Sequence, residues 1–369
     1  MTRDTLILQP LEVEPDSPVG GKAKALASLV QARLPIPEWF VLLPAAFSLS
    51  LGEAEQRLLS GAGYESGQAV ANLLGGLSLS PEVANEVRAA YDLLCPDGAP
   101  VAVRSSAADE DSAALSFAGQ LESYLFVTPD QLLQRIVDVW RSGFSERIIA
   151  YRREAGLAPL PGAPAVIVQR VINGTASGVA FSGDPVSGRR RTVVVAGVLG
   201  LGEALVSGEA DSDTWHVDLE GRILERRIAH KRIAARRDPD KPDGMVREPV
   251  SAEQADVPVL TDAQVAAVSR LARDAARHFG LPQDIEWTLA EGDGEAELYL
   301  LQSRPITTLT DKPDPDDPLR LWDNTNIIES YSGVTSPFTF SFIRRCYEEV
   351  YRGFCRIMRV PDQVIEANS

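Results

Sequence analysis

The chain of 369 residues is 44% hydrophobic and 24% charged, which is typical of a globular protein with two or three compact units and excludes a single small module. Its 52 acidic and 36 basic side chains give a net charge of −16, which disfavours binding to nucleic acid or to anionic membranes. Three widely spaced cysteines, and the lack of an apolar run of the ~20 residues that span a bilayer, favour a cytoplasmic chain without disulfides or membrane segments.

Apolar spacing predicts helices and strands that do not alternate strictly. A short strand at 5–8 is followed by a helix within 22–34 and a strand at 39–43, whereas residues 52–80 carry little periodic signal and 81–94 predict a helix. Further elements are expected, in chain order, as strands at 100–106 and 121–127, a helix at 129–142, strands at 164–172, 177–182, 192–199, 214–218 and 222–228, and a helix at 261–279. The fold class is therefore mixed, with α+β and α/β architectures both open.

A proline-rich acidic segment at 311–318 can neither propagate a helix nor pair in the centre of a sheet. We expect it to be a linker at the end of a domain. The aromatic segment 319–369, with one amphipathic helix from Phe340 onward, is expected to begin a following domain or to pack as a tail on the main body.

Residues 284–304 predict two strands joined at a Gly-Asp-Gly turn. A hairpin that is symmetric about Asp293 pairs Asp284 with Gln302 and places all even-numbered residues on one face. The odd-numbered face is then apolar and consists of Ile285, Trp287, Leu289, Tyr299 and Leu301.

The even-numbered face of this hairpin carries Asp284, Glu286 and Gln302, with Arg304 just past the strand. Carboxylate and amide oxygens can hold Mg²⁺ while a guanidinium clamps a phosphate. The alternative is a solvent-exposed polar face with a surface ion pair.

Two other segments offer groups that suit a phosphate. The strand at 100–106 delivers Arg104 into a region rich in serine, alanine and glycine, where Gly119 permits close backbone approach and Ser123 supplies a hydroxyl. Lys22 lies at an expected helix start, where free N–H groups favour an anion. The surrounding residues are not a Walker A motif, so a solvated lysine is the alternative.

A nucleotide base and its ribose have candidate partners as well. The strand that ends near Val171 can present Gln169 and main-chain groups to an adenine. Glu203 could bind ribose hydroxyls or could simply begin a helix. The preceding Gly200 lies in a glycine turn that lacks the third glycine of a dinucleotide-binding motif, so a Rossmann-type oxidoreductase ranks last. The three histidines, His216, His230 and His278, show no metal-ligand or nucleophile spacing.

Taken in order, the motifs GGKAKAL, VAVRSSA, SFAGQLESYL, VIVQRVINGTASGVAFSGDP, GLGEALVSG and DIEWTL…LYLLQSRPIT resemble the ATP-binding domain of the pyruvate phosphate dikinase and phosphoenolpyruvate synthase family, which includes rifampin phosphotransferases. The resemblance covers roughly residues 15–310. It implies an ATP-grasp fold with two lobes, 1–172 and 173–310, around a nucleotide cleft.

The resemblance also implies the ligands of the site. The phosphate-binding cations are Lys22, Arg104 and Arg304, the phosphate loop contributes Gly119 and Ser123, the adenine lies against Gln169 and Val171, the ribose against Glu203, and Mg²⁺ against Glu286 and Gln302. Ser123 stands where many members have threonine, which conserves the hydroxyl.

In this family the β-phosphoryl group of ATP passes to a histidine on a swivelling domain, and AMP is released. The glycine- and threonine-rich histidine motif of that domain does not occur in these 369 residues. The resemblance therefore implies a partner domain in cis or in trans, and an isolated chain that binds ATP without completing a turnover. The alternatives are an ATP-sensing module without catalysis and the ATP domain of an antibiotic or other small-molecule phosphotransferase.

Overall fold

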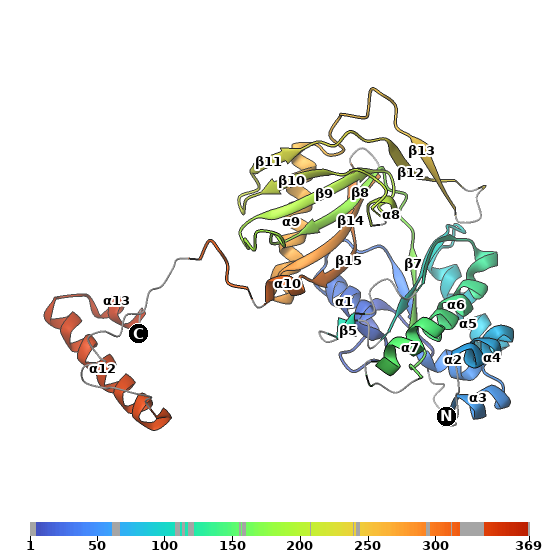
Figure 1. Ribbon diagram of the computed structural model, residues 1–369, viewed down its shortest axis with the longest axis horizontal. Helices are drawn as coiled ribbons and strands as arrows, with labels where there is room; N and C mark the ends of the chain where they lie inside the picture. Colours follow the sequence, from blue (N-terminus) through green and yellow to red (C-terminus); the bar gives the residue numbers. More distant parts are fainter. Residues whose placement is uncertain are drawn as a thin grey trace. The chain divides into compact units, whose positions relative to one another are not determined.

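The computed structural model describes residues 5–60, 67–107, 111–112, 115–116, 122–154, 156, 160–206, 208–238, 240, 244–292, 296–310, 312–317 and 336–367. The chain divides into two compact units, Met1–Asp316 and Asp317–Ser369, whose elements are labelled in Figure 1. The division falls within the acidic, proline-rich segment 311–318.

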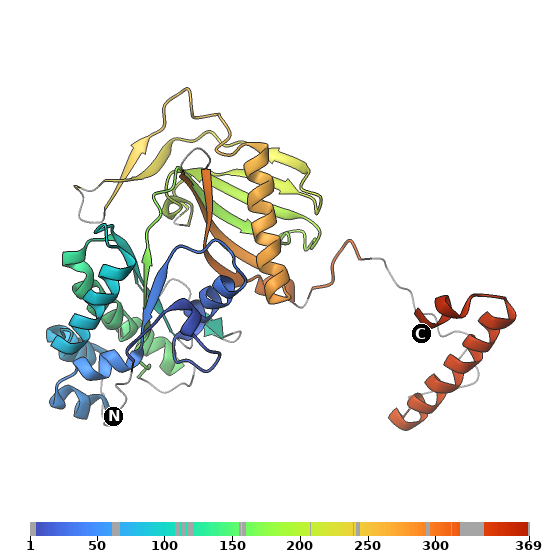
Figure 2. The same cartoon turned by 180° about the vertical axis from the view of Figure 1, so that it is seen from behind.

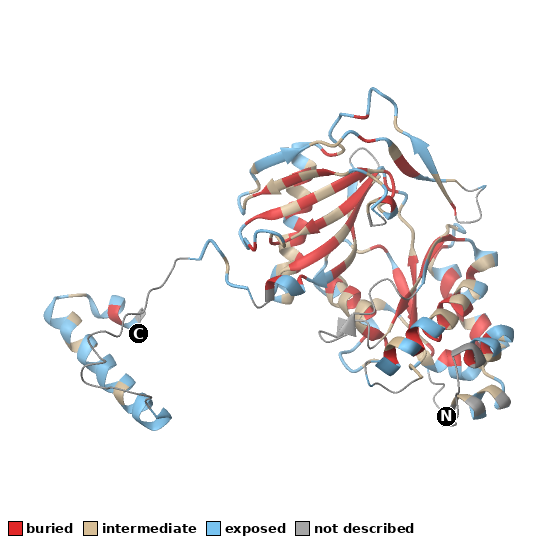
Figure 3. Cartoon of the chain, viewed as in Figure 1, coloured by how far each residue is buried: buried red, intermediate tan, exposed pale blue. Residues whose placement is uncertain are grey.

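The first half of the larger unit is built on a five-stranded sheet with the strand order β1-β2-β7-β3-β6. Its strands are β1 (Ile7–Leu8), β2 (Trp39–Leu42), β7 (Ala165–Arg170), β3 (Val101–Ser106) and β6 (Ser123–Val127), and all neighbours are antiparallel. The helices around it are α1 (Gly20–Gln31), α2 (Pro44–Ser50), α3 (Glu53–Ser60), α4 (Gly67–Leu73), α5 (Pro81–Leu94), α6 (Pro129–Gly143) and α7 (Glu146–Glu154). Figure 3 shows that the inner strands β2, β7 and β3 are almost entirely buried.

The core of this half gathers side chains from distant parts of the sequence. Trp140 of α6 is fully buried and meets Phe47 of α2 edge-on, with ring centroids 5.5 Å apart. Helices α3 and α4 form within residues 52–80, where the sequence carries little periodic signal. Helices of eight and seven residues are about two turns long, which is too short for apolar spacing to reveal.

The second half contains a six-stranded antiparallel sheet with the order β11-β10-β9-β8-β14-β15. Its strands are β8 (Ala176–Phe181), β9 (Val193–Leu199), β10 (Asp213–Val217), β11 (Ile223–Arg227), β14 (Gln283–Glu291) and β15 (Ala296–Pro305). The long helix α9 (Asp262–Phe279) covers one face (Figure 2), and its apolar side shares a core with Trp215 and Trp287 of the sheet. Two short helices, α8 (Glu203–Val206) and α10 (Thr307–Thr310), complete this half.

A separate pair of antiparallel strands, β12 (Ile233–Arg237) and β13 (Met245–Pro249), forms an arm beyond the six-stranded sheet (Figure 1). We did not predict these strands, because the arginines of β12 obscure any apolar alternation. A buried ion pair fixes the chain just before the arm: Lys231 Nζ donates to Asp213 Oδ1 over 2.9 Å. Asp213 also accepts from the main-chain N–H groups of Ala229 and Val259, so both of its oxygens are satisfied.

The β14–β15 hairpin confirms the expected strands but corrects their register. Gln302 lies opposite Glu286, and not opposite Asp284, which pairs with Arg304. A bulge between Glu286 and Trp287 shifts the ladder, so that Trp287 pairs with Leu300. Tyr299 and Leu301 therefore leave the apolar face where we expected them, and Leu298 and Leu300 pack against the core. The polar face of β14 is as expected.

The second unit contains α12 (Pro337–Ile357) and α13 (Asp362–Ala367). The first of these helices begins three residues before the expected Phe340, because Ser336 caps it by accepting a hydrogen bond from the N–H of Thr339. Across the described residues, no helix combines the length and the apolarity needed to cross a membrane. The mixed α/β class and the two sheet-based halves agree with the fold class expected from the sequence.

Candidate functional site

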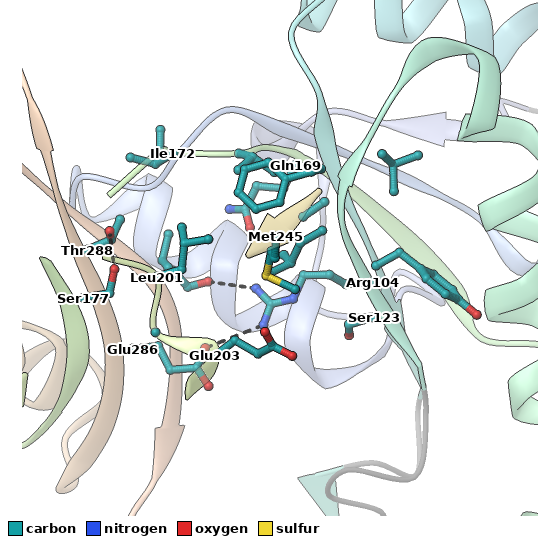
Figure 4. A pocket seen from close by; sticks show the side chains of 18 of the residues that line it. Arg104, Ser123, Gln169, Ile172, Ser177, Leu201, Glu203, Met245, Glu286 and Thr288 are labelled. Carbon is teal, nitrogen blue, oxygen red and sulfur yellow. Dashed lines mark hydrogen bonds and ion pairs between the residues drawn. The ribbon is translucent and has the colours of Figure 1, made fainter. Parts of the chain in front are cut away.

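A cavity of about 570 Å³ lies where the two halves of the larger unit meet (Figure 4). Six predicted site residues line it, and they come from both halves: Arg104, Ser123, Gln169, Val171, Glu203 and Glu286. The fold thus brings together positions separated by up to 182 residues, as the ordered motifs had suggested.

Arg104 is the central polar group of this cavity. It projects from β3, a strand flanked on both sides in the five-stranded sheet, and its backbone pairs with that of Ser123 on β6. Its guanidinium donates to Gln302 Oε1 over 2.6 Å and to the carbonyl oxygen of Leu301 over 3.3 Å. Figure 4 shows it reaching toward Glu286, whose Oε2 lies 3.9 Å away. Arg104 therefore connects the two sheets directly.

Three other predicted residues line a neighbouring cavity of about 490 Å³: Lys22, Gln302 and Arg304. Lys22 lies in the first turn of α1. Gly20 lets this helix approach β3 closely, because its φ is +74° and a Cβ atom there would lie 2.4 Å from the carbonyl oxygen of Ser106. The Ser106 hydroxyl also accepts a hydrogen bond from the N–H of Ala23, over 3.0 Å. The Arg104–Gln302 hydrogen bond joins residues of the two cavities.

The cross-strand pair Glu286 and Gln302 offers two hard oxygen ligands on one face of the hairpin. Both oxygens lie within 4 Å of the same nitrogen of Arg104. No group of three His, Cys, Asp or Glu side chains suited to a metal occurs among the described residues. Mg²⁺ does not require such a cage, since it commonly binds one or two protein oxygens together with substrate phosphates and water. The donor set therefore fits that ion.

Asp284 is the second carboxylate on this face, and it is only 8% exposed. Its Oδ2 accepts from Arg304 Nε over 2.8 Å, while its Oδ1 has no hydrogen-bond partner among the described residues. Burial raises the pKa of the Asp284 carboxyl above the usual 3.8, against the opposing effect of Arg304, and the nearby Glu286 carboxylate raises it further.

This shift predicts how Asp284→Asn changes the pH dependence of stability. Because the pKa is higher in the folded state, ionisation of Asp284 costs the folded protein free energy as the pH rises above 3.8. We expect wild type to lose stability relative to Asp284→Asn over that rise, on top of a pH-independent difference between a neutral carboxyl group and an amide at this position. Urea unfolding of both proteins between about pH 3.5 and 7 measures this, since the range begins just below the usual pKa of an aspartate, about 4. A difference that is independent of pH would contradict the prediction.

The two predicted adenine contacts lie in β7 and directly after it. Gln169 is buried, and its Nε2 donates to the carbonyl oxygen of Pro37 over 3.4 Å. The N–H of Val171 donates to the carbonyl oxygen of Pro100 over 3.5 Å, at the long end of the hydrogen-bond range. Gly119 lies outside the described residues.

Sequence reasoning missed most of the apolar wall of the cavity and one buried hydroxyl pair. Phe126, Leu201 and Met245 line the cavity, together with Ser177 and Thr288, whose hydroxyl oxygens are 2.8 Å apart. Thr288 belongs to the even-numbered, polar face of β14, and Ser177 follows a small-residue turn. No pattern in the sequence predicted a strand at Met245, so this residue could not be assigned to the cavity.

Residues 16–320 match the family described as the pyruvate phosphate dikinase, AMP/ATP-binding domain. The chain belongs to this family. The resemblance stated from the motifs is thereby confirmed, and the cavity between the two sheets lies within the matched ATP-binding domain.

Several curated relatives are similar to this ATP-binding domain. A rifampicin phosphotransferase from Bacillus subtilis is 41% identical over 58% of this chain and 24% of its own length, and one from a Streptomyces species is 38% identical over 84% and 36%. A probable phosphoenolpyruvate synthase from Pyrococcus abyssi is 33% identical over 79% of this chain and 35% of its own length. The chain thus spans 24–36% of the length of these three curated relatives. Among solved structures, D-alanine–D-alanine ligase from Bacillus anthracis aligns with 78% of this chain and 57% of its own, at 9% identity and a TM-score of 0.32.

Proposed function

We propose that the cleft binds ATP with Mg²⁺ and that the domain directs the β-phosphoryl group of ATP to a histidine on a swivelling domain outside these residues. The histidine displaces AMP from the β-phosphorus, and water cleaves the β–γ bond, so that the γ-phosphoryl group leaves as phosphate. The observation that carries the proposal is the convergence of Arg104, Glu286 and Gln302 at the junction of the two sheets. A cation and two hard oxygen donors on one face suit a metal-bound polyphosphate.

The remaining roles follow from where each residue lies. Arg104 would bind phosphate oxygens in the cavity of about 570 Å³, and Lys22 and Arg304 would bind them from the neighbouring cavity. Ser123, at the start of β6 and paired with Arg104, would add a hydroxyl, and Gly119 would be a further phosphate contact, as the resemblance implies. The base would lie against Gln169, Val171 and the apolar wall, and the ribose against Glu203.

Glu286 and Gln302 would hold Mg²⁺, which supplies positive charge to the phosphates during transfer. The chain's own contribution is positioning and electrostatic stabilisation rather than acid–base chemistry. Arg104 is suited to this, because its hydrogen bonds to Gln302 and Leu301 hold the guanidinium in place before any ligand enters.

The relatives' names include both rifampicin phosphotransferases and phosphoenolpyruvate synthases, so two acceptor classes, an antibiotic and pyruvate, are compatible with the same nucleotide chemistry. An ATP-sensing module without catalysis is the weaker alternative, since a sensor requires fewer groups around the phosphates than the three cations and the oxygen pair found in the two cavities.

The first experiment measures ATP binding and phosphoryl transfer by this chain. Calorimetry with Mg·ATP should show saturable binding, and saturating ligand should raise the melting temperature. With ATP labelled in the β-phosphate, a protein that carries the family's histidine motif should become labelled in trans and AMP should accumulate. Binding without transfer would favour the sensor, and no binding would refute the proposal.

The chain's own histidines should remain unlabelled in that experiment. His216 lies near Glu225, and His230 and His278 interact with Asp256 and Ser28. Within the described lining of the cleft there is no histidine, whereas transfer needs a nucleophile within about 3–3.5 Å of the phosphorus. Rapid stoichiometric labelling of any of the three would instead make the chain a self-sufficient phosphotransferase.

A further inference from the structure

The β12–β13 arm is anchored at one end to the half that contains the six-stranded sheet. The N–H of Leu201 donates to the carbonyl oxygen of Ala235 over 2.8 Å, next to a bridge between Gly200 and Ala235. Gly200 makes this approach possible, because its φ is +74° and a Cβ atom there would lie 2.1 Å from that same oxygen. This end of the arm is therefore hydrogen-bonded to the segment that leads to Glu203.

The other end of the arm touches the half that contains the five-stranded sheet, at Phe126 of β6. A Cβ atom on Gly244 would lie 2.4 Å from the Cβ of Phe126, so the backbone of Gly244 packs directly against the Phe126 side chain and leaves no room for a methyl group. Arg237, on the opposite strand of the arm, places its guanidinium 5.7 Å from the centre of the same ring. The arm thus bridges the two halves of the unit.

Phe126 holds an unusual backbone conformation at this contact. Its φ is +55°, a left-handed value that is rare for a bulky residue, and it lies where the β3–β6 ladder shifts register. The side chain is nevertheless 94% buried, at 6% exposure. Strain of this kind persists only where the surroundings hold it in place, and it occurs often in ligand clamps and switches.

The same contact forms part of the wall of the nucleotide cavity. Phe126 and Leu201 belong to one small apolar cluster, with Met245 packed against it, and all three line the cavity of about 570 Å³. Figure 4 shows Met245 and Leu201 facing the space beside Arg104. Separation of Gly244 from Phe126 would withdraw Met245 and open this wall.

We infer that Phe126 and Gly244 form a latch that holds the β12–β13 arm against the five-stranded sheet and so slows the release of bound nucleotide. The inference rests on the proposed function, because the ligand retained by the latch is the ATP of that proposal. Phe126 and Gly244 act here as positioning residues: they place Met245 and Leu201 against the ligand and need not touch its phosphates.

Gly244→Ala tests the latch, because its new methyl group would collide with Phe126. We expect it to raise the dissociation rate of a fluorescent Mg·ATP analogue by roughly tenfold, within the range usual for coupled sites, with a smaller change in the association rate. Stopped-flow displacement by excess ATP measures both rates. Gly98→Ala is the matched control: its φ of +69° is close to the +67° of Gly244, but a Cβ atom there meets nothing within 4 Å. It should leave both rates near those of wild type.

Phe126→Gly provides a second test of the latch, because this substitution introduces no collision. It removes the ring and the strained side chain, so we expect faster dissociation from this variant as well. Adding Gly244→Ala to Phe126→Gly should then have little further effect, because the colliding Cβ of Phe126 is gone. This non-additivity would not arise from two independent losses of stability.

The outcomes separate the latch from the proposed function. If wild type binds Mg·ATP but Gly244→Ala releases it no faster than Gly98→Ala, or if the effects of Gly244→Ala and Phe126→Gly multiply, the latch is refuted. If Gly244→Ala does not fold, unchanged dissociation from Phe126→Gly refutes it. If wild type binds no ATP, the proposed function fails and the latch fails with it.

Discussion

Replacing Trp287 with alanine should lower the free energy of unfolding by about 3–5 kcal/mol. The indole is fully buried on β14, the second strand from one edge of the six-stranded sheet. It lies over two glycines, one on the adjacent strand β8 and one on the next strand β9: Cβ atoms built on Gly178 and Gly197 would approach it to 2.8 and 3.3 Å. Truncation therefore leaves a cavity between β14, β8 and β9 that these glycines cannot fill. Urea unfolding followed by circular dichroism measures the loss.

Trp287→Phe serves as the graded control. The indole nitrogen of Trp287 has no hydrogen-bond partner among the described residues, so phenylalanine loses volume but no hydrogen bond. We expect less than half of the alanine effect, because a smaller cavity costs less. Equal losses in both variants, or a loss below about 1 kcal/mol for alanine, would show that the site relaxes and that Trp287 is not the centre of this core.

The β14–β15 hairpin shows what sequence periodicity can and cannot predict about the faces of a strand. Alternation placed Glu286 and Trp287 on opposite faces of β14 correctly, because the side chains of a regular strand alternate. The same rule failed for Tyr299 and Leu301 on β15, because the bulge changes the parity of one strand relative to the other. A bulge depends on how the two strands pair, and neither strand's own pattern contains it.

Sequence reasoning selected many of the residues that line the candidate site, but it did not predict their division between two cavities. Arg104 and Glu286 were recognised from a strand end and from strand parity, and the fold brings them within 3.9 Å. Lys22 and Arg304 line the neighbouring cavity, a separation that arises from how α1 packs on β15. Met245 lines the cavity of about 570 Å³ because it lies on β13 of the arm, a strand that the sequence pattern did not predict. Contacts between distant segments of this kind are set by tertiary packing, which local patterns do not encode.

Glu286→Ala should weaken the binding of Mg·ATP by roughly 100-fold, the scale of losing one well-placed electrostatic group in a cleft. The side chain lies on the polar face of β14, opposite Gln302, and its removal leaves one of the two proposed oxygen ligands. The fold should remain intact, because this carboxylate is partly exposed and belongs to none of the apolar clusters. Calorimetry at several Mg²⁺ concentrations, together with urea unfolding, measures both quantities.

Glu291→Ala is the matched control for this substitution. Glu291 lies on the same strand and is exposed, and it is not among the residues that line either cavity. Its removal changes the net charge by the same amount, so any general electrostatic effect of losing an acidic side chain should appear equally in both variants. If Glu286→Ala binds Mg·ATP as tightly as Glu291→Ala, or if the loss does not depend on Mg²⁺, Glu286 does not hold the metal, and the ligand set must be sought elsewhere on the face that carries Asp284.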